Sequence, residues 1–278
     1  MVRIVSDTST LYSSQQALEA GFQVAPLSVT INGQSYLEFD EIIPEQFVDI
    51  INQGHLPTSS QPSVGQVAEI FEQYPEDEII DIAMADGLSG TYNGAVAAAQ
   101  TCDHQDKITV INSRTLCGPH RYLVEKAVKM AGEGKSKAEI VAHVEELMAT
   151  SQSYLMPADV DYLRRGGRLS PLVSYVGGAM KLVPIMTLTE DCKQLTVATI
   201  RRSFPQAVKH VIKLIEECGN GENWRIYISH AAAPKVAGMA RELLQEHFPK
   251  AIIETYGLSP AGITQGGPGC MAIQTIRV

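Results

Sequence analysis

The stretch "EIIDIAMADGLSGTYNGAVAAAQ", residues 78–100, decides how the chain is expected to fold. Residues 78–85 form an apolar run that is typical of a buried strand, and the Ala-rich residues 91–100 are typical of a helix. Strands of a parallel sheet are buried on both faces, so they read as continuous apolar runs of this kind. The stretch therefore predicts a strand followed directly by a helix, the repeating unit of parallel α/β sheets.

The same alternation runs through the first part of the chain. Further strands are predicted at residues 2–5 and 107–113, helices at residues 12–21 and 134–150, and the turn of a hairpin at Asn32-Gly33. This order of elements favours an α/β domain with a parallel sheet.

The second part of the chain has a different pattern. A β-rich segment turns at Glu190-Asp191 and is followed by two helices and three strands. We therefore predict two α/β domains, residues 1–155 with a parallel sheet and residues 156–278 with a mixed sheet.

The composition limits the classes of partner. The chain has 278 residues, of which 45% are apolar and 19% charged, and its net charge is -9. This negative charge argues against nucleic acid and anionic membranes, because both bind basic surfaces. No run reaches the roughly 18 apolar residues of a membrane span, and the N-terminus lacks the pattern of a signal peptide. Five scattered cysteines without metal-ligand spacing predict free thiols, a cytoplasmic location, and neither a metal nor a cofactor.

Three segments place Ser and Thr side chains where a helix is expected to begin: residues 5–10 (VSDTST), 57–63 (PTSSQPS) and 86–92 (DGLSGTY). The first and the third directly follow a strand, and ligands of open parallel sheets bind outside the carboxyl ends of the strands. Helix starts offer free backbone N–H groups, to which the hydroxyl groups add further donors. We therefore predict a carboxylate site that uses no cation. Ordinary helix capping is the alternative for any one of these segments.

The sequence "GLSGT", residues 87–91, leaves a second interpretation open. It resembles the G-x-S-x-G turn of serine hydrolases, although Thr91 takes the place of the last glycine. A hydrolase also needs a histidine base, and His230, at the end of a predicted strand, is the only plausible one. The alternative function is therefore a serine-dependent lipase or esterase that uses Ser89 and His230.

A compact positive cluster lies at residues 163–170 (LRRGGRLS), where arginines surround a pair of glycines. Arginines in such a cluster suit a phosphate or an acidic partner surface. A solvated turn is the alternative, because glycines allow the backbone to turn sharply.

These motifs together resemble the DegV family, the bacterial fatty-acid-binding proteins called FakB in some species. SDTST, TSSQPS, GLSGTYNGA, LRRGGRLS and GGPG occur in the order and spacing of the family over nearly the whole chain. The resemblance implies a DegV-like two-domain α/β fold that holds one long-chain fatty acid, such as palmitate, between its domains. The N-terminal domain would bind the carboxylate, and the C-terminal domain would cover the acyl chain with apolar residues such as those of 179–188.

The resemblance also implies roles for individual residues at the carboxylate. The matching positions are Ser59 and Ser89, beside Thr58, Ser60 and Gln265. Gln265 stands where the family usually has a histidine, which removes a possible positive charge from the site.

Members of the family present the bound acid to a fatty acid kinase, which forms an acyl phosphate for phospholipid synthesis. The resemblance implies that Arg168 would face such a kinase, and Arg201 is a further candidate for the same kind of surface. The chain itself would be a lipid carrier rather than an enzyme. Because Gln265 lacks the charge of the usual histidine, lipid binding is better supported than service to a kinase.

Overall fold

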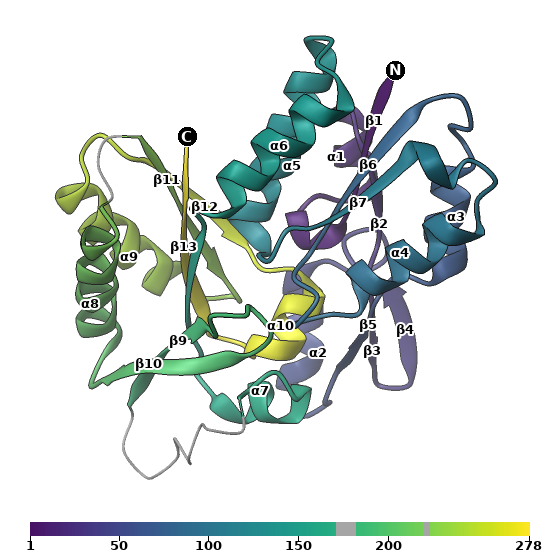
Figure 1. Ribbon diagram of the computed structural model, residues 1–278. Coiled ribbons are helices and arrows are strands. Elements are labelled where there is room, and N and C mark those ends of the chain that lie inside the picture. Colours follow the sequence, from purple (N-terminus) through teal and green to yellow (C-terminus); the bar gives the residue numbers. More distant parts are fainter. Residues whose placement is uncertain (171–181, 220–222) are drawn as a thin grey trace.

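The computed structural model describes residues 1–170, 182–219 and 223–278, and these form two α/β halves that lie side by side (Figure 1). The N-terminal half is built on a parallel sheet in the order β2-β1-β6-β7. Its strands are β1 (Val2–Asp7), β2 (Gln23–Ala25), β6 (Glu78–Ala83) and β7 (Ile108–Asn112). The parallel sheet predicted from the sequence is confirmed.

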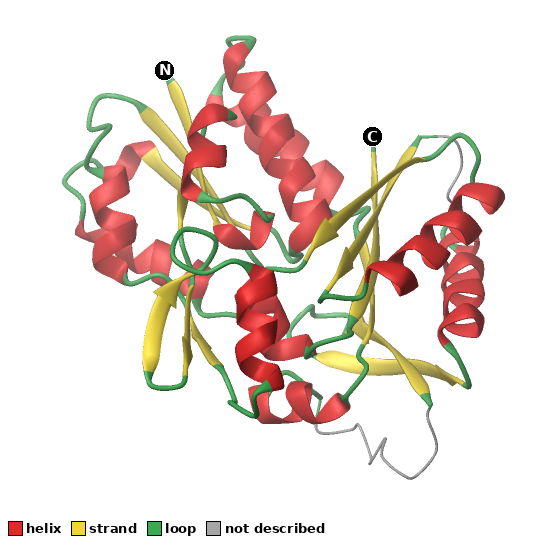
Figure 2. Ribbon diagram, turned by 180° about the vertical axis from the view of Figure 1, so that it is seen from behind, coloured by secondary structure: helices red, strands yellow, loops and turns green. Residues whose placement is uncertain are grey.

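Helices cover both faces of this parallel sheet, as Figure 2 shows from behind. They are α1 (Ser14–Glu19), α3 (Val64–Phe71), α4 (Thr91–Thr101), α5 (Cys117–Gly132) and α6 (Lys137–Met148), with short 3-10 turns η1 (Thr8–Thr10) and η2 (Gln105–Lys107). Phe71 of α3 and Ala98 of α4 pack against one face of the sheet. Leu123 of α5 and Val144 of α6 pack against the other. Both faces of the strands are therefore buried, which explains their unbroken apolar runs.

A small antiparallel sheet in the order β4-β3-β5 extends the N-terminal half. Its elements are β3 (Ser28–Ile31), β4 (Gln34–Leu37), α2 (Pro44–Asn52) and β5 (Thr58–Ser60). Asn32 and Gly33 join β3 to β4 with positive φ angles, so the predicted hairpin is confirmed. The helix start expected at residues 57–63 is only partly correct. Its first residues form β5, and α3 begins after the capping residue Ser63.

The C-terminal half is built on a mixed sheet in the order β10-β9-β8-β13-β11-β12, in which only β11 and β12 are parallel neighbours. Its strands are β8 (Gln152–Met156), β9 (Val183–Leu188), β10 (Leu195–Arg201), β11 (Trp224–His230), β12 (Ile252–Gly257) and β13 (Met271–Arg277). The helices α8 (Phe204–Glu217) and α9 (Pro234–His247) bury their apolar sides against one face of this sheet. The predicted mixed sheet is confirmed.

Residue 155, where the sequence analysis ends the first domain, lies inside β8. This strand pairs with β13 and β9 and not with any strand of the parallel sheet. β8 therefore belongs with the C-terminal sheet, and the chain passes between the halves just after α6.

Two short helices lie where the halves meet: α7 (Val160–Gly166) and α10 (Pro260–Gly266). α10, yellow in Figure 1, packs against α7 and against α2, β3 and β5 of the N-terminal half. No sequence pattern predicted α10, because its seven residues include two glycines and carry no periodic apolar pattern. α10 is thus the main helical contact of the C-terminal half with the small sheet.

The loop after β6 also contacts the C-terminal half. A Cβ atom on Gly87 would lie 2.1 Å from the Cα atom of Lys193, in the turn between β9 and β10. Only glycine permits this close approach of two backbones. Asp86 forms an ion pair with the ammonium group of Lys193 at the same place. The loop that carries Ser89 is therefore held against the β9–β10 hairpin.

Candidate functional site

A cavity of about 400 Å³ lies between the two halves. Its N-terminal wall contains Ser9 after β1, Ser89 after β6 and Leu116 after β7. All three residues follow the carboxyl ends of parallel strands, where ligands of open α/β sheets bind. The volume falls within the ~300–1,000 Å³ that is typical of small-molecule sites. The first and third Ser/Thr segments of the sequence analysis therefore reach one cavity, together with part of the second.

Ser59 and Gln265 meet in the wall of this cavity. The Nε2 atom of Gln265, on α10, donates a hydrogen bond to the Oγ atom of Ser59, on β5, at 3.1 Å. Because Ser59 accepts this bond, its own hydroxyl proton is available to a ligand. The pairing brings together two residues that the resemblance assigned to the carboxylate.

Ser89 lies in the same wall, in the loop that leads into α4. Its Oγ atom is 2.8 Å from Oγ1 of Thr91 and accepts a hydrogen bond from the Thr91 backbone N–H at 3.3 Å. These contacts orient the hydroxyl group of Ser89 at the start of the helix. Thr58 and Ser60 are both exposed on β5, and of the two only Ser60 borders the cavity.

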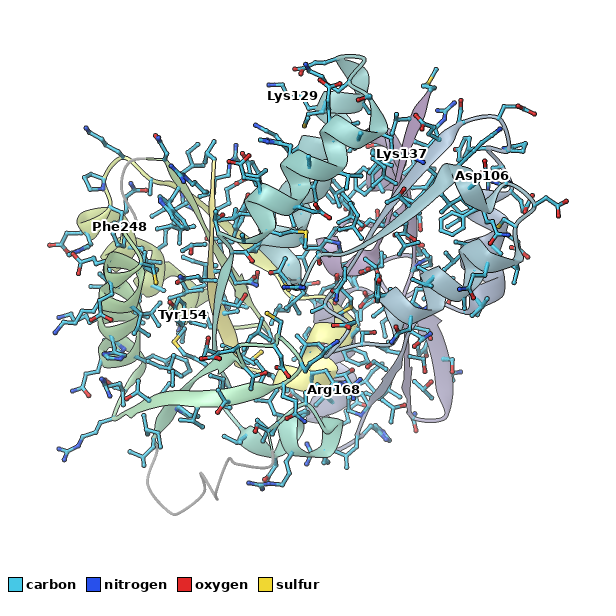
Figure 3. The ribbon with its side chains drawn as sticks, in the orientation of Figure 1. Asp106, Lys129, Lys137, Tyr154, Arg168 and Phe248 are labelled. Atoms are coloured by element: carbon cyan, nitrogen blue, oxygen red, sulfur yellow. The ribbon has the colours of Figure 1, made fainter. Side chains whose placement is uncertain are left out.

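Arg168 is half-buried and forms part of the cavity wall, beside α10 in Figure 3. Its Nε atom donates to the carbonyl oxygen of Leu88 at 3.0 Å, and its Nη1 atom donates to that of Gly166. The guanidinium group thus connects the end of α7 to the loop that carries Ser89. The wall contains a cation, which the sequence analysis did not expect.

Arg201 lies at the far end of β10. Leu195 at the start of this strand borders the cavity, and Arg201 is six positions further along the strand, roughly 20 Å away. Arg201 contacts Nδ1 of His210 at 2.7 Å and, with Lys209 and Lys213, surrounds a separate shallow depression. Burial and the neighbouring Arg201 charge lower the pKa of His210. The structure therefore does not place Arg168 and Arg201 on one surface.

The proposed hydrolase pair of Ser89 and His230 is not brought together. The Nδ1 atom of His230 accepts a hydrogen bond from the backbone N–H of Ala233 at 3.2 Å, and His230 does not border the cavity. Burial lowers the pKa of this imidazole. The hydroxyl group of Ser89 bonds to Thr91 instead.

A buried histidine that the sequence analysis missed contacts the cavity through Ser9. The Nε2 atom of His120 lies 2.8 Å from the carbonyl oxygen of Ile82, and its Nδ1 atom lies 2.8 Å from Oγ of Ser9. Because a carbonyl oxygen only accepts, a neutral imidazole carries its proton on Nε2 and accepts from Ser9 through Nδ1. The sequence offered little indication of this role, because the hydrogen-bond partners of His120 lie far from it in the chain.

Glu38 is a second buried group that the sequence analysis missed. Its side chain is 0% exposed and accepts hydrogen bonds from Oγ1 of Thr8 at 2.5 Å and from the backbone N–H of Ala261 at 2.8 Å. Burial raises the pKa of this carboxyl group to about 7. Glu38 therefore connects the first Ser/Thr segment to the start of α10.

The rest of the wall is mostly apolar. Leu155 on β8 and Ala272 on β13 are paired in register and face the cavity, beside Leu163 of α7. Of the expected tail-covering residues 179–188, the first three lie outside the described residues. Leu188 borders the cavity, whereas Val183 and Ile185 pack in the core beneath α8.

The described parts of the chain contain neither a metal-ligand cluster nor a membrane-spanning helix. No three or more His, Cys, Asp or Glu side chains there are grouped so that they would hold a metal ion. No helix within those residues has the length and apolar character that crossing a membrane requires.

Comparisons with known proteins show the family to which this sequence and fold belong. The family model described as DegV family matches residues 1–278. A DegV domain-containing protein of Caldanaerobacter subterraneus is 34% identical over 220 residues, which cover 78% of each chain.

Two solved structures have the same fold. A DegV family protein from Thermus thermophilus, described as fatty acid binding, superposes with a TM-score of 0.90 at 24% identity, covering 100% of this chain and 99% of the other. DegV from Bacillus subtilis, described as a fatty acid binding protein, superposes with a TM-score of 0.87 at 25% identity and the same coverage. Since the family model spans every residue and both halves superpose on DegV structures, the chain belongs to the DegV family.

Proposed function

We propose that this protein binds one long-chain fatty acid in the cavity between its halves. The carboxylate lies at Ser59 and Ser89, and the acyl tail lies along Leu155 and Ala272 of the C-terminal sheet. The observation that carries the proposal is the convergence of hydroxyl, amide and guanidinium groups in one wall of a cavity whose remaining wall is mostly apolar. The DegV proteins from Thermus thermophilus and Bacillus subtilis, which share the fold, are described as fatty acid binding.

The energies of such a complex are adequate for tight binding. Burial of about 14 methylene groups contributes on the order of 11 kcal/mol, at roughly 0.8 kcal/mol each. The loss of translational and rotational freedom on association costs about 4–15 kcal/mol. Each hydrogen bond from Ser59 or Ser89 to a carboxylate adds about 1.5–3 kcal/mol. Head-group contacts therefore decide whether the complex is tight.

The remaining polar residues support the head group in different ways. Gln265 donates to Ser59, so it directs the Ser59 proton towards the ligand. Arg168 lends positive charge to the same wall, where a carboxylate would otherwise lose its hydration. Ser60 lines the wall as a further donor, and the exposed Thr58 is the least supported of the group.

We also propose that the loaded protein presents its carboxylate to a fatty acid kinase, which forms the acyl phosphate. This step rests on the family resemblance and on Arg168, which is half-buried beside the head-group wall. Arg201 with its neighbouring lysines is a second basic surface for an acidic partner. Free thiols at all five cysteines agree with a reducing compartment such as the cytoplasm.

Mass spectrometry of the purified protein tests the proposal. Protein isolated from cells without detergent is denatured and extracted, and we expect close to one fatty acid per chain. Delipidated protein should then regain one equivalent on titration with palmitate. An empty protein that fails to take up any fatty acid contradicts the proposal. Steady hydrolysis of a fatty acid ester, lost in Ser89→Ala, supports the lipase alternative instead.

A further inference from the structure

The acyl end of the cavity contains a polar pair that the carboxylate does not need. Gln274 on β13 and Ser153 on β8 lie opposite each other in the strand register, and both border the cavity. They share a face with Ala272 and Leu155, because side chains two positions apart on a strand point to the same side. Two polar side chains therefore interrupt the apolar wall of two neighbouring strands.

The hydrogen bonds of Gln274 determine which way its amide group is turned. Its nitrogen, Nε2, is 2.9 Å from the carbonyl oxygen of Leu116 and 2.8 Å from Oγ of Ser153. A carbonyl oxygen only accepts hydrogen bonds, so the amide atom that faces Leu116 must be the nitrogen. The other amide atom, Oε1, is consequently the acceptor whose partner has to be found.

This acceptor has no partner within residues 1–170, 182–219 and 223–278. Gln274 is 2% exposed, and a buried acceptor without a hydrogen bond destabilises the protein that contains it. Ser153 accepts from Gln274, so its own hydroxyl proton remains available to donate. The pair thus offers one acceptor and one donor side by side.

The pair lies on β8 and β13, the two strands along which the proposed acyl tail lies. Gln265 lies on α10, which precedes the start of β13 at Met271. Gln274 is three strand residues further on, roughly 10 Å along the strand. Because the proposed acyl tail lies along Ala272 and Leu155, which share this face, the tail meets Ser153 and Gln274.

Resting on the proposed function, we propose that Ser153 and Gln274 form a subsite for a hydroxyl group on the acyl tail, and that hydroxy fatty acids are a preferred class of ligand. A hydroxyl group donates to Oε1 of Gln274 and accepts from Oγ of Ser153, so it satisfies both. A keto oxygen only accepts and leaves Oε1 without a partner. A methylene group satisfies neither side chain.

Binding of matched C18 acids to the delipidated protein tests this subsite. The probes are octadecanoic acid, monohydroxy-octadecanoic acids with the hydroxyl group at successive tail positions, and the corresponding keto acids. We expect one hydroxy isomer to bind about tenfold more tightly than octadecanoic acid, and its keto analogue to lack this gain. In a uniformly apolar wall, every hydroxy isomer would bind more weakly than octadecanoic acid, and that result overturns the inference.

Variants of the pair complete the test, with the ratio of the two affinities as the readout. Gln274→Met should abolish the preference for the hydroxy isomer, and Ser153→Ala, which keeps the bond from Gln274 to Leu116, should reduce it. Thr275→Val, on the opposite face of β13, is the control and should keep the wild-type ratio. A preference that survives in both Gln274→Met and Ser153→Ala overturns the subsite.

The affinity for octadecanoic acid separates this inference from the proposed function. If the wild-type protein binds octadecanoic acid and no hydroxy isomer more tightly, only the hydroxyl subsite is refuted. If it binds none of the acids, the proposed function fails and the subsite fails with it.

Discussion

Two regions of the cavity wall are built differently. Around Ser59 and Ser89, polar side chains from loops, a short helix and the small sheet converge on the cavity. Along Leu155 and Ala272, the wall consists of alternate residues on two paired strands. The first region, the head-group end, depends on contacts between the halves, such as that of Gln265 with Ser59. The second, the strand wall, is set by strand register within one sheet. The two regions should therefore respond differently to mutation: changes at the head-group end alter the binding of every acid, whereas changes at the strand wall alter the choice among acids.

The largest effect is expected from the double variant Ser59→Ala/Ser89→Ala. It removes two hydrogen bonds to a carboxylate, each of about 1.5–3 kcal/mol, so the affinity for any fatty acid should fall at least about a hundredfold. Isothermal titration with acids of several chain lengths measures this loss. Ser63→Ala is the control in the same segment. It removes the cap of α3 and should lower stability by about 1 kcal/mol without weakening binding. A full complement of lipid in the folded double variant would sink the assignment.

The next largest effect concerns Glu38, which supports the head-group end beneath α10. Its pKa is about 7 in the folded protein against an ordinary value of 4.5, because the carboxyl group is fully buried. Between these values the folded state holds more protons than the unfolded state. The contribution of Glu38 to stability is therefore greatest below about pH 4.5 and is lost as the pH rises to 7, on the order of 3 kcal/mol.

Chemical denaturation at a series of pH values measures this effect. The free energy of unfolding should decline less between pH 5 and pH 8 in Glu38→Gln than in the wild-type protein. Burial and the charge of Asp7 also raise the pKa of Asp81 to about 7. Asp81 accounts for the decline in the free energy of unfolding that remains in Glu38→Gln. Glu69→Gln on the exposed side of α3 serves as the control. An unchanged pH profile in Glu38→Gln would mean that Glu38 is ionised in the folded protein throughout this range.

A smaller effect is expected at the strand wall from Ala272→Leu. Ala272 is 8% exposed and borders the cavity, so a larger side chain takes space from the acyl tail. Exclusion of about two methylene groups costs roughly 1.6 kcal/mol, about tenfold in affinity for acids that fill the cavity. Shorter acids should lose much less, and they are the internal control. An equal loss for long and short acids would place Ala272 outside the path of the tail.

The smallest effect is expected from Gln265→His at the head-group end. A histidine gains positive charge near pH 6.5, whereas an amide does not titrate. The affinity of the variant for an ionised acid should rise a few-fold as the pH falls from 8 towards 6, beyond the change seen with the wild-type protein. Titrations of both proteins with one fatty acid, corrected for its own ionisation, measure the difference. Matching pH profiles would place residue 265 away from the carboxylate.

Local patterns in the sequence predicted the elements well. Residues 78–100 read as a strand and a helix and form β6 and α4. The helix predicted at residues 134–150 forms α6, which begins at a capping box of Ser136 and Glu139. Such patterns succeed because strand burial and helix capping depend on residues that are close together in the chain. α10 was not predicted, because a seven-residue helix with two glycines has no such local pattern.

Residues a few positions apart in the sequence were enough to predict the α/β class, the parallel and mixed sheets and the Ser/Thr segments that follow strands. Which of these residues meet depends on how the two halves pack against each other. Ser59 and Gln265 are 206 positions apart, and Glu38 is 223 positions from Ala261. The packing of the halves also places Arg168 in the cavity wall, whereas Arg201 lies away from it. The physical reason is that these contacts arise where the two halves pack together, and their packing depends on the shape and burial of whole surfaces, which no local pattern encodes.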